Sequence, residues 1–415
     1  MTDRVIIVGG GHIGIACAHY LQQDGHDVTV IDQGEIGGGC SYANCGFIAP
    51  SHVLPLTTPD ALLEGFRSLF QPRAAFRVKP QLRGSLMRWM WEFGRRCTHD
   101  DMLAASRSLH SLLEASASEY HALLRLPELH CGWRDNGLLF VFRSAKALQD
   151  FSKTDTLVSR EYGLSARLIP ADDLHEFEPA LLDGLAGAYL YECDSHLRPD
   201  HLNASWTELL KNQGVKFIEH CRVDSIERQN GEVFELQTSQ GNMSADHYVF
   251  AAGAWSSSLG AALDCEIPVE PGKGYSVTMT KPATMPSHPM LMPEKHIAIT
   301  PFDDGIRIAS MMEFAGFDTS IPPFRIQQLQ DSARPFLKDP VGPTIEETWY
   351  GWRPMTWDSL PIIGRIAHLP NALLATGHNM LGLSLAPITG KAIADLVAER
   401  ATDIPLDAVS PDRFS

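Results

Sequence analysis

The pattern of apolar and polar positions at the start of the chain predicts a strand, a helix and a second strand. Residues 5–8 are an apolar run with no polar face, which is typical of a buried parallel strand. A helical run follows as far as Gly25, and residues 27–31 form a second strand-like segment that ends at Asp32. We therefore expect a βαβ unit of a doubly wound α/β domain.

A glycine motif connects the first predicted strand to the predicted helix. Gly9, Gly11 and Gly14 fit the pattern G-x-G-x-x-G. These glycines allow a tight turn, a close approach of the backbone to a pyrophosphate, and close packing of helix on strand. Asp32 stands where a carboxylate accepts hydrogen bonds from an adenosine ribose. The motif predicts a dinucleotide site, against the alternative of a glycine-rich turn in another doubly wound sheet, and does not separate FAD from NAD.

Small residues are dense between positions 37 and 50, which predicts that backbone lies against a flat or bulky group. In a flavoprotein that group would be the ribityl chain and the ring. The alternative is a flexible surface loop, which the apolar side chains of Tyr42, Phe47 and Ile48 disfavour.

The pattern becomes helical over about 61–126, where three apolar stripes predict a helical insertion. The stripes begin at Leu62, Leu82 and Leu109. The remaining elements up to residue 346 are predicted as strands at 132–134 and 137–142, a helix at 144–161, a loop through Pro170 and Pro179, a helix at 199–213, strands at 215–218, 223–226 and 247–250, and a mainly antiparallel region at 267–346.

A second strand followed by a helix closes the chain. Residues 372–376 are apolar, a loop runs through Gly377 and His378 to Gly382, and a helix is predicted over 384–399. Its start also directs backbone N–H groups at a ligand. Two such helix starts suit FAD better than NAD, because one can hold the pyrophosphate and the other the N1/C2=O edge of the flavin.

Composition excludes several classes of protein. The formal net charge of −16 over 415 residues argues against broad nucleic-acid binding, which depends on Lys and Arg. Eight scattered cysteines without a C-x-x-C pair indicate reduced thiols and a cytoplasmic protein. No apolar run is long enough to span a bilayer, and the chain is expected to begin at its mature N-terminus. No metal-ligand motif is present.

The segment 61–96 reverses the acidic balance of the chain, with eight Arg or Lys side chains against Glu64 and Glu92. A basic, aromatic face of this kind could rest on anionic lipid headgroups. The alternative is an ordinary helical subdomain whose arginines pair with acids elsewhere in the chain.

Six motifs in this order resemble the D-amino-acid oxidase superfamily of flavoenzymes, and within it most closely the D-amino-acid dehydrogenase branch. The motifs are Gly9 to Gly14, Ser41 to Gly46, Ala251 to Trp255, Lys273 to Tyr275, Gly351 to Pro354 with Asp358 and Pro361, and Thr376 to Gly382. The resemblance implies a Rossmann-like FAD-binding domain from discontinuous segments, 1–60, 191–265 and 347–400, in an α/β fold. It also implies an α+β substrate domain with a mainly antiparallel sheet, 61–190 and 266–346.

The resemblance also implies site residues. Arg353 is at the position of the arginine that binds the substrate carboxylate, and Tyr275 is a candidate phenol that shapes the substrate pocket. The alternatives are an arginine that braces the strand and a tyrosine of the core. The predicted cofactor-binding residues are Gly9, Gly11, His12, Ile13, Gly14, Asp32, Gln33, Cys40, Ser41, Asn44, Cys45, Gly46, Val223, Ala252, Gly253, Trp255, Gly377, His378, Met380, Leu381, Gly382 and Leu383.

The flavin is expected to be non-covalent. Sarcosine-oxidase-type members attach it through a cysteine just upstream of the Asp-x-x-Pro run, where this chain has Trp352 to Met355. Cys40 and Cys45 could be proposed as a redox pair, but small apolar packing is favoured for both.

The expected reaction is dehydrogenation of a D-amino acid such as D-alanine, or of a cyclic one such as D-proline or cis-4-hydroxy-D-proline, by hydride transfer to flavin N5. Electrons would pass to a quinone or respiratory acceptor, with the protein in the cytoplasm or peripheral on the inner face of the membrane. The alternatives are an oxygen-using amine oxidase of the glycine or sarcosine oxidase type, a non-catalytic or RNA-modifying flavoprotein, and a two-domain NAD enzyme.

Overall fold

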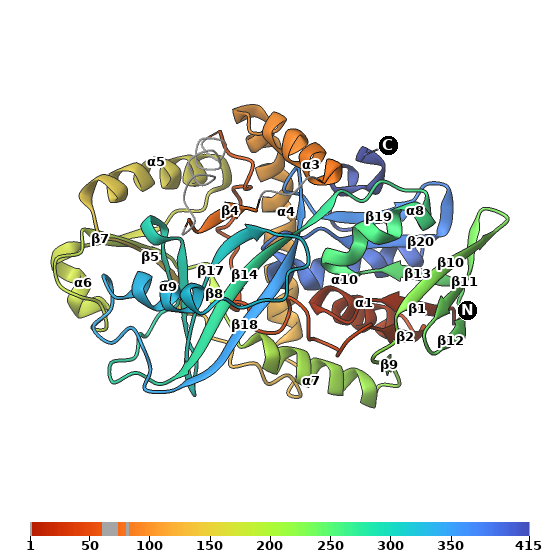
Figure 1. Ribbon diagram of the computed structural model, residues 1–415, viewed down its shortest axis with the longest axis horizontal. Coiled ribbons are helices and arrows are strands. Elements are labelled where there is room, and N and C mark those ends of the chain that lie inside the picture. The colour runs from red at the N-terminus through yellow and green to blue at the C-terminus, as the bar shows by residue number, and fades with distance from the viewer. Residues whose placement is uncertain (1, 60–73, 80–82, 415) are drawn as a thin grey trace.

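Two bodies lie side by side in the computed structural model, each built on a large sheet (Figure 1). The structure describes residues 2–59, 74–79 and 83–414. In Figure 1 the body on the right carries both chain ends, and the body on the left carries strands β5 (Leu138–Phe142) and β7 (Gly187–Tyr191). None of the helices in these ranges is long and apolar enough to cross a membrane.

A six-stranded sheet forms the right-hand body, in the order β19-β20-β13-β1-β2-β9, and all neighbouring strands are parallel except β19 and β20. Its strands are β1 (Arg4–Val8), β2 (Asp27–Ile31), β9 (Lys216–Ile218), β13 (His247–Phe250), β19 (Ile362–Ile366) and β20 (Leu369–Thr376). Residues 5–8 are all buried, because β1 is a central strand whose two faces are both covered.

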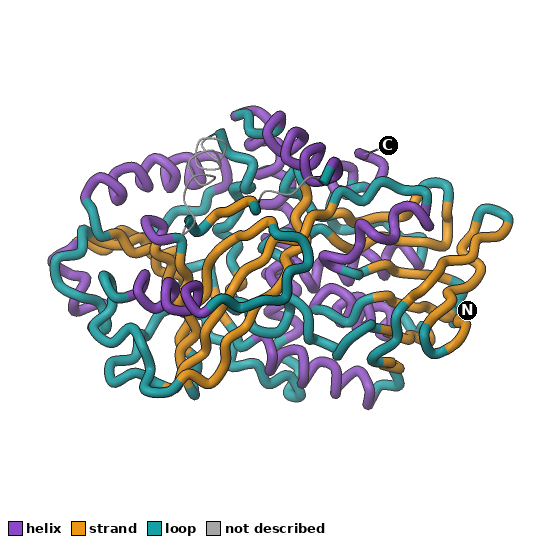
Figure 2. The backbone as a smooth tube through the Cα atoms, in the orientation of Figure 1, coloured by secondary structure: helices purple, strands orange, loops and turns teal. Residues whose placement is uncertain are grey.

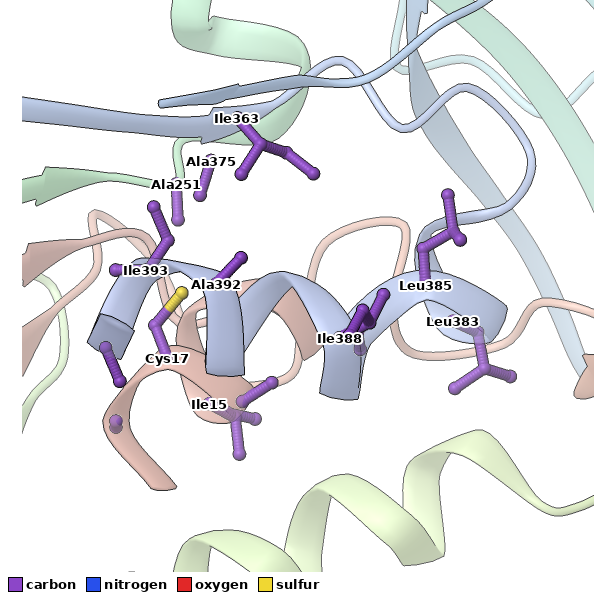
Figure 3. Packing of buried hydrophobic residues seen from close by; sticks show 14 of the residues in the cluster. Ile15, Cys17, Ala251, Ile363, Ala375, Leu383, Leu385, Ile388, Ala392 and Ile393 are labelled. Carbon is purple, nitrogen blue, oxygen red and sulfur yellow. The ribbon is translucent and has the colours of Figure 1, made fainter. Parts of the chain in front are cut away.

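Helices α1 (His12–Gln23) and α10 (Gly382–Val397) pack on each other against this sheet. A Cβ at Gly390 of α10 would lie 2.5 Å from the carbonyl of Ala16 in α1, so a glycine lets the two helices approach closely. Figure 3 shows Cys17 of α1 beside Ala392 and Ile393 of α10. The two ends of the chain therefore share one hydrophobic core.

A nine-stranded sheet forms the left-hand body, in the order β18-β14-β17-β16-β15-β5-β7-β6, with β4 also paired to β17. It is antiparallel except at the β15–β5 and β17–β4 pairs. Its strands are β4 (Phe76–Val78), β5 (Leu138–Phe142), β6 (Arg167–Pro170), β7 (Gly187–Tyr191), β14 (Val269–Thr280), β15 (Met290–Met292), β16 (Ile297–Pro301), β17 (Gly305–Phe314) and β18 (Ile345–Thr356).

The remaining elements surround the two sheets, and Figure 2 shows helices along the upper and outer edges of the left-hand body. The helices are α3 (Gly84–Arg95), α4 (His99–Leu123), α5 (Ala145–Tyr162), α6 (Ala171–Phe177), α7 (Pro199–Asn212), α8 (Gly260–Leu263), α9 (Pro323–Ala333) and the short η1 (Gly253–Leu259), η2 (Pro293–Lys295), η3 (Asp407–Val409) and η4 (Pro411–Phe414). Two smaller sheets are β3 (Phe47–Ile48) with β8 (Ser195–His196), and β10 (Val223–Gln229) with β11 (Glu232–Thr238) and β12 (Gly241–Met243).

The structure confirms the predicted fold class, and three local predictions are wrong. Strand β4 lies within the segment 61–126 that the sequence predicts to be helical, because residues 76–78 pair with β17. Residues 132–134 are not a strand, since only Arg134 forms an isolated bridge, to His196. Residues 167–177 are strand β6 and helix α6 instead of a loop. Pro170 has a φ of −62° and precedes the helix, where its missing N–H costs nothing, and two aspartates in the first turn suit the helix dipole.

Two other predictions are not decided by the structure. The apolar stripe that begins at Leu62 lies outside the described residues. The domain boundaries stay a prediction, and strand β18 crosses the one placed between 346 and 347.

Candidate active site

A cavity of about 1580 Å³ is lined by residues from both large sheets. It exceeds the roughly 300–1,000 Å³ that a single small ligand occupies in most proteins, so it has room for a cofactor and a substrate. All predicted site residues line it except Gly14 and Gly377. We call the part formed by residues 9–13, 32–46 and 378–383 the nucleotide half, and the part formed around Arg353 by β14, β17 and β18 the substrate half.

Two helix starts open onto the nucleotide half. Gly11 precedes α1 and Leu381 precedes α10, and neither residue caps its helix with a side-chain hydrogen bond. Ser41 accepts a hydrogen bond from the first N–H of α1, that of His12. An uncapped helix start leaves backbone N–H groups and a partial positive charge directed at a ligand. This arrangement fits a dinucleotide that has both a pyrophosphate and a ring edge on which negative charge develops.

The glycines of the N-terminal motif are required by close backbone contacts. Gly9 has a φ of +115°, and a Cβ there would lie 2.3 Å from the carbonyl oxygen of Ala251. A Cβ at Gly14 would lie 1.8 Å from the carbonyl oxygen of Gly9. Gly14 therefore does not line the cavity but lets α1 pack against the end of β1.

Asp32 ends β2 at the wall of the cavity, and backbone donors fix its carboxylate. Oδ2 accepts a hydrogen bond from the Gly10 N–H at 2.7 Å, and Oδ1 accepts one from the Gly34 N–H at 2.8 Å. Each carboxylate oxygen can accept a second hydrogen bond. Asp32 therefore keeps acceptor capacity for the hydroxyl groups of a ribose.

Hydrogen bonds connect the small-residue loop at 37–50 to helices α1, α7 and α10. The hydroxyl of Ser41 accepts a hydrogen bond from the His12 N–H at 3.0 Å. Asn203 of α7 donates to the carbonyl oxygens of Gly37 and Ser41, each at 3.2 Å. Ser384 of α10 accepts from the Ala49 N–H at 3.2 Å. The loop is ordered by long-range contacts, which disagrees with the alternative of a flexible surface loop.

Two buried histidines line the nucleotide half in their neutral form. Burial lowers the pKa of His12 to about 4 and that of His378 to about 3. The Nε2 atom of His378 lies 3.0 Å from the hydroxyl of Thr389, in the middle of α10. Because both rings are neutral, neither adds a positive charge to those of the two helix starts.

Arg353 of β18 lies in the substrate half without an acidic partner. One Nη atom donates to the carbonyl oxygen of Met311 at 2.8 Å, and no carboxylate lies within ion-pair distance of Arg353 in the described part of the chain. Burial lowers the pKa of Arg353. The guanidinium remains charged, because arginine is not deprotonated in proteins. A partly buried charge without an acidic partner favours a counter-charge, and a ligand carboxylate would supply it.

Tyr275 of β14 lines the cavity, but its hydroxyl is committed within the protein. It donates to Glu313 Oε2 at 2.6 Å, and Glu313 also pairs with the buried Arg325. Burial, and then Glu313, raise the pKa of Tyr275. The phenol is therefore neutral and fixed in orientation, as a residue that shapes a pocket requires.

Apolar side chains close the substrate half. Trp89 and Phe93 of α3, together with Met312 and Phe314 of β17, belong to one hydrophobic cluster and line the cavity. Burial raises the pKa of Cys40, and raises that of Cys45 to about 11, so both thiols are neutral. All eight cysteines of the chain are free.

Sequence reasoning missed several residues that position the site. Asn203 holds the loop, Glu313 orients Tyr275, and Gly274 leaves the space that the Arg353 guanidinium fills, since a Cβ at 274 would lie 2.3 Å from Nη1. A pattern that could have found Gly274 is its place beside Tyr275 in a predicted strand, where a glycine indicates close approach of another group.

The basic segment 61–96 is paired with acids wherever the structure describes it. The ion pairs are Arg77 with Glu313, Lys79 with Asp318, Arg83 with Glu270, Arg88 with Glu266, and both Arg95 and Arg96 with Glu92. Arg67 and Arg73 lie outside the described residues. These pairs favour the alternative of an ion-paired helical subdomain. Lipid contact stays a prediction, and α3 leaves Met87 and Trp91 about two-thirds exposed.

The chain belongs to the DAO family of FAD-dependent oxidoreductases, whose sequence profile matches residues 4–396. It is therefore a flavoenzyme with FAD as its cofactor. The glycine contacts and the two open helix starts of the nucleotide half fit that cofactor.

Solved structures share the fold over nearly the full length. Glycine oxidase from Geobacillus kaustophilus superposes with a TM-score of 0.79 at 23% identity, covering 99% of this chain and 98% of that one. L-proline dehydrogenase from P. horikoshii gives 0.73 at 20% identity, covering 100% and 98%. L-alpha-glycerophosphate oxidase from Mycoplasma pneumoniae, with FAD bound, gives 0.73 at 16% identity, covering 98% and 97%. At these identities the similarity shows the fold, and the substrates named belong to those proteins.

Proposed function

We propose that this protein is an FAD-dependent dehydrogenase that oxidises a D-amino acid or a cyclic D-imino acid at its α-carbon. The observation that supports the proposal is the unpaired Arg353 guanidinium in the cavity onto which both helix starts open. A planar guanidinium binds an α-carboxylate through two parallel hydrogen bonds. D-alanine, D-proline and cis-4-hydroxy-D-proline are the substrates to test first.

The reaction removes two electrons from the substrate. When bound, FAD supplies the two-electron acceptor. The Cα–H bond breaks and its electron pair leaves as hydride, the amine loses a proton, and a C=N bond forms. Water then hydrolyses the imine of a primary amino acid to a 2-oxo acid and ammonia. A substrate whose amine binds neutral needs no protein base for the hydride step.

The residues of this chain contribute binding and orientation. Arg353 fixes one end of the substrate, so that the Cα–H bond is held in a reactive geometry. The apolar wall of Trp89, Phe93 and Phe314 excludes water and strengthens the interaction of Arg353 with a carboxylate.

The experiment that tests the proposal compares Arg353→Met with Arg334→Met, an exposed arginine at the end of α9. Purified protein is assayed with the three substrates and an artificial dye as electron acceptor. Arg353→Met should raise KM by roughly 100-fold or more, because the substrate carboxylate loses its charged partner, while the flavin absorption spectrum stays the same. Arg334→Met should match the parent protein.

Two results would change the proposal. Unchanged kinetics in Arg353→Met, or no turnover of any amino acid, would favour a non-catalytic or RNA-modifying flavoprotein. Rapid oxygen consumption by the parent protein with substrate would make it an amine oxidase instead of a dehydrogenase that reduces a quinone or a respiratory acceptor.

A further inference from the structure

Strand β17 contains a bulge beside Arg353. Lys273 of β14 pairs with Glu313 and Tyr275 pairs with Ser310, so Met311 and Met312 together stand opposite the single residue Gly274. The other edge of β17 changes partner at the same place, from β16 at Ser310 to β4 at Met312.

Met311 has an unusual backbone conformation for its residue type. Its φ of +76° lies in the left-handed region, which favours glycine and is strained for a side chain such as that of methionine. The side chain is 6% exposed and packs in the hydrophobic cluster of the left-hand body. Packing of the side chain thus holds a backbone conformation that the residue alone would not favour.

The bulge presents a carbonyl to the Arg353 side chain across a neighbouring strand. Strands β18, β14 and β17 are adjacent in that order (Figure 1), so Arg353 must pass over β14 to reach Met311. It passes at Gly274, where a Cβ would lie 2.3 Å from Nη1, and its Nη1 then donates to the Met311 carbonyl at 2.8 Å. In a regular strand the carbonyl groups point at the neighbouring strands, within the plane of the sheet. A side chain that lies above the face of the sheet is poorly placed to donate a hydrogen bond to them.

We propose that the Met311 bulge is a positioning device for Arg353, and thereby sets the orientation in which a ligand carboxylate is bound. One N–H of the guanidinium is held by the Met311 carbonyl, and the remaining donors are left for the carboxylate. Met311 is a positioning residue, since it acts through Arg353. The inference rests on the proposed function, in which Arg353 binds the substrate carboxylate.

The test compares Met311→Gly with Met311→Ala. Both variants remove the thioether side chain, and they differ in that glycine accepts a φ of +76° and alanine does not. The affinity of the holoenzyme for propionate, a carboxylate without an amine, is measured from the change in the flavin absorption band. Met311→Ala should bind propionate about tenfold more weakly than Met311→Gly, with the same flavin content. KM for the amino acid should follow the same order.

If Met311 only filled space in the core, the order of propionate affinities would be reversed, because Met311→Gly removes more buried surface than Met311→Ala. Equal propionate affinities, or weaker binding by Met311→Gly, would overturn the inference. Should Met311→Ala not yield folded holoenzyme, Met311→Asn and Met311→Leu replace the pair, since Asn tolerates the left-handed region and Leu keeps the volume. Met311→Asn should then bind propionate more tightly, and the reverse order would overturn the inference.

Arg353→Met separates the two proposals. If Arg353→Met weakens propionate binding while both Met311 variants bind alike, the positioning role fails and the proposed function stands. If Arg353→Met leaves propionate binding unchanged, the proposed function fails.

Discussion

The nucleotide half of the cavity is built mainly from backbone, whereas the substrate half is built from side chains that several strands bring together. In the nucleotide half, the uncapped starts of α1 and α10 and the glycines around Gly9 offer N–H groups and close approach. In the substrate half, Arg353, Met311 and Gly274 come from three different strands.

The difference shows where each half tolerates change. A site made of backbone depends on a few glycines. A larger residue at one of them would place its Cβ against main-chain atoms, which cannot move aside as a side chain can. A site made of side chains depends on the positions of those side chains relative to one another. A side chain can be displaced there while the backbone, and so the fold, stays unchanged. Damage to the nucleotide half should therefore remove the cofactor, and damage to the substrate half should leave the flavin in place and weaken substrate binding.

The largest effect is expected for Gly14→Ala. The added Cβ would lie 1.8 Å from the Gly9 carbonyl oxygen, so α1 must move away from β1 and its start from the phosphate position. Purified Gly14→Ala should retain about one tenth or less of the flavin of the parent protein, measured from its visible absorption per mole of protein. Gly84→Ala is the matched control, since a Cβ at the first residue of α3 meets no atom within 4 Å. Full flavin content in Gly14→Ala would contradict the backbone account of this half.

Gly274→Ala tests the substrate half, and its effect is smaller in that the flavin stays bound and only substrate binding is weakened. The new methyl group would occupy the space of the Arg353 guanidinium, and the far end of a flexible side chain can move aside. KM for the amino acid should rise roughly 10- to 100-fold, with flavin content equal to that of Gly84→Ala. Loss of the flavin together with substrate binding would show that the two halves are not independent.

The smallest effect is expected for His378→Asn, which concerns the pH dependence of the nucleotide half. Burial lowers the folded-state pKa of His378 to about 3, below its ordinary value of 6.5. The folded state therefore binds fewer protons than the unfolded state as the pH falls. The contribution of the neutral ring to the free energy of unfolding is complete above pH 6.5 and is lost below it. At pH 5.5 the loss is about 1 kcal/mol.

The measurement is the midpoint of thermal unfolding at pH 7.5 and 5.5, with FAD in excess. The unfolding midpoint should fall between pH 7.5 and pH 5.5 in both proteins. The fall should be smaller in His378→Asn than in the parent protein, by a few °C at most. His12, His52 and His196, whose pKa values burial also lowers to about 4, keep part of the drop in both proteins. An equal drop in both proteins would mean that His378 is not held neutral by the fold.

Much of the nucleotide half was predictable from local sequence, because its contacts belong to short contiguous motifs. The strand at 5–8, the glycines from Gly9 onward and the acid at Asp32 stand within one βαβ unit, and the structure places them as expected. The wrong local predictions, at 76–78, 132–134 and 167–177, concern short elements that depend on tertiary pairing, as Arg134 does with His196.

The sequence by itself determined the class of fold, the FAD family and the candidate arginine, since each depends on residue types at fixed spacing. Only the tertiary structure decided that Asn203 holds the loop at 37–50, that the Tyr275 hydroxyl is bound to Glu313, and that Arg353 crosses Gly274 to reach Met311. The physical reason is that hydrogen bonds and steric contacts between strands depend on register and on bulges. A shift of one residue in β17, which no local pattern records, aims the Met311 carbonyl at the guanidinium.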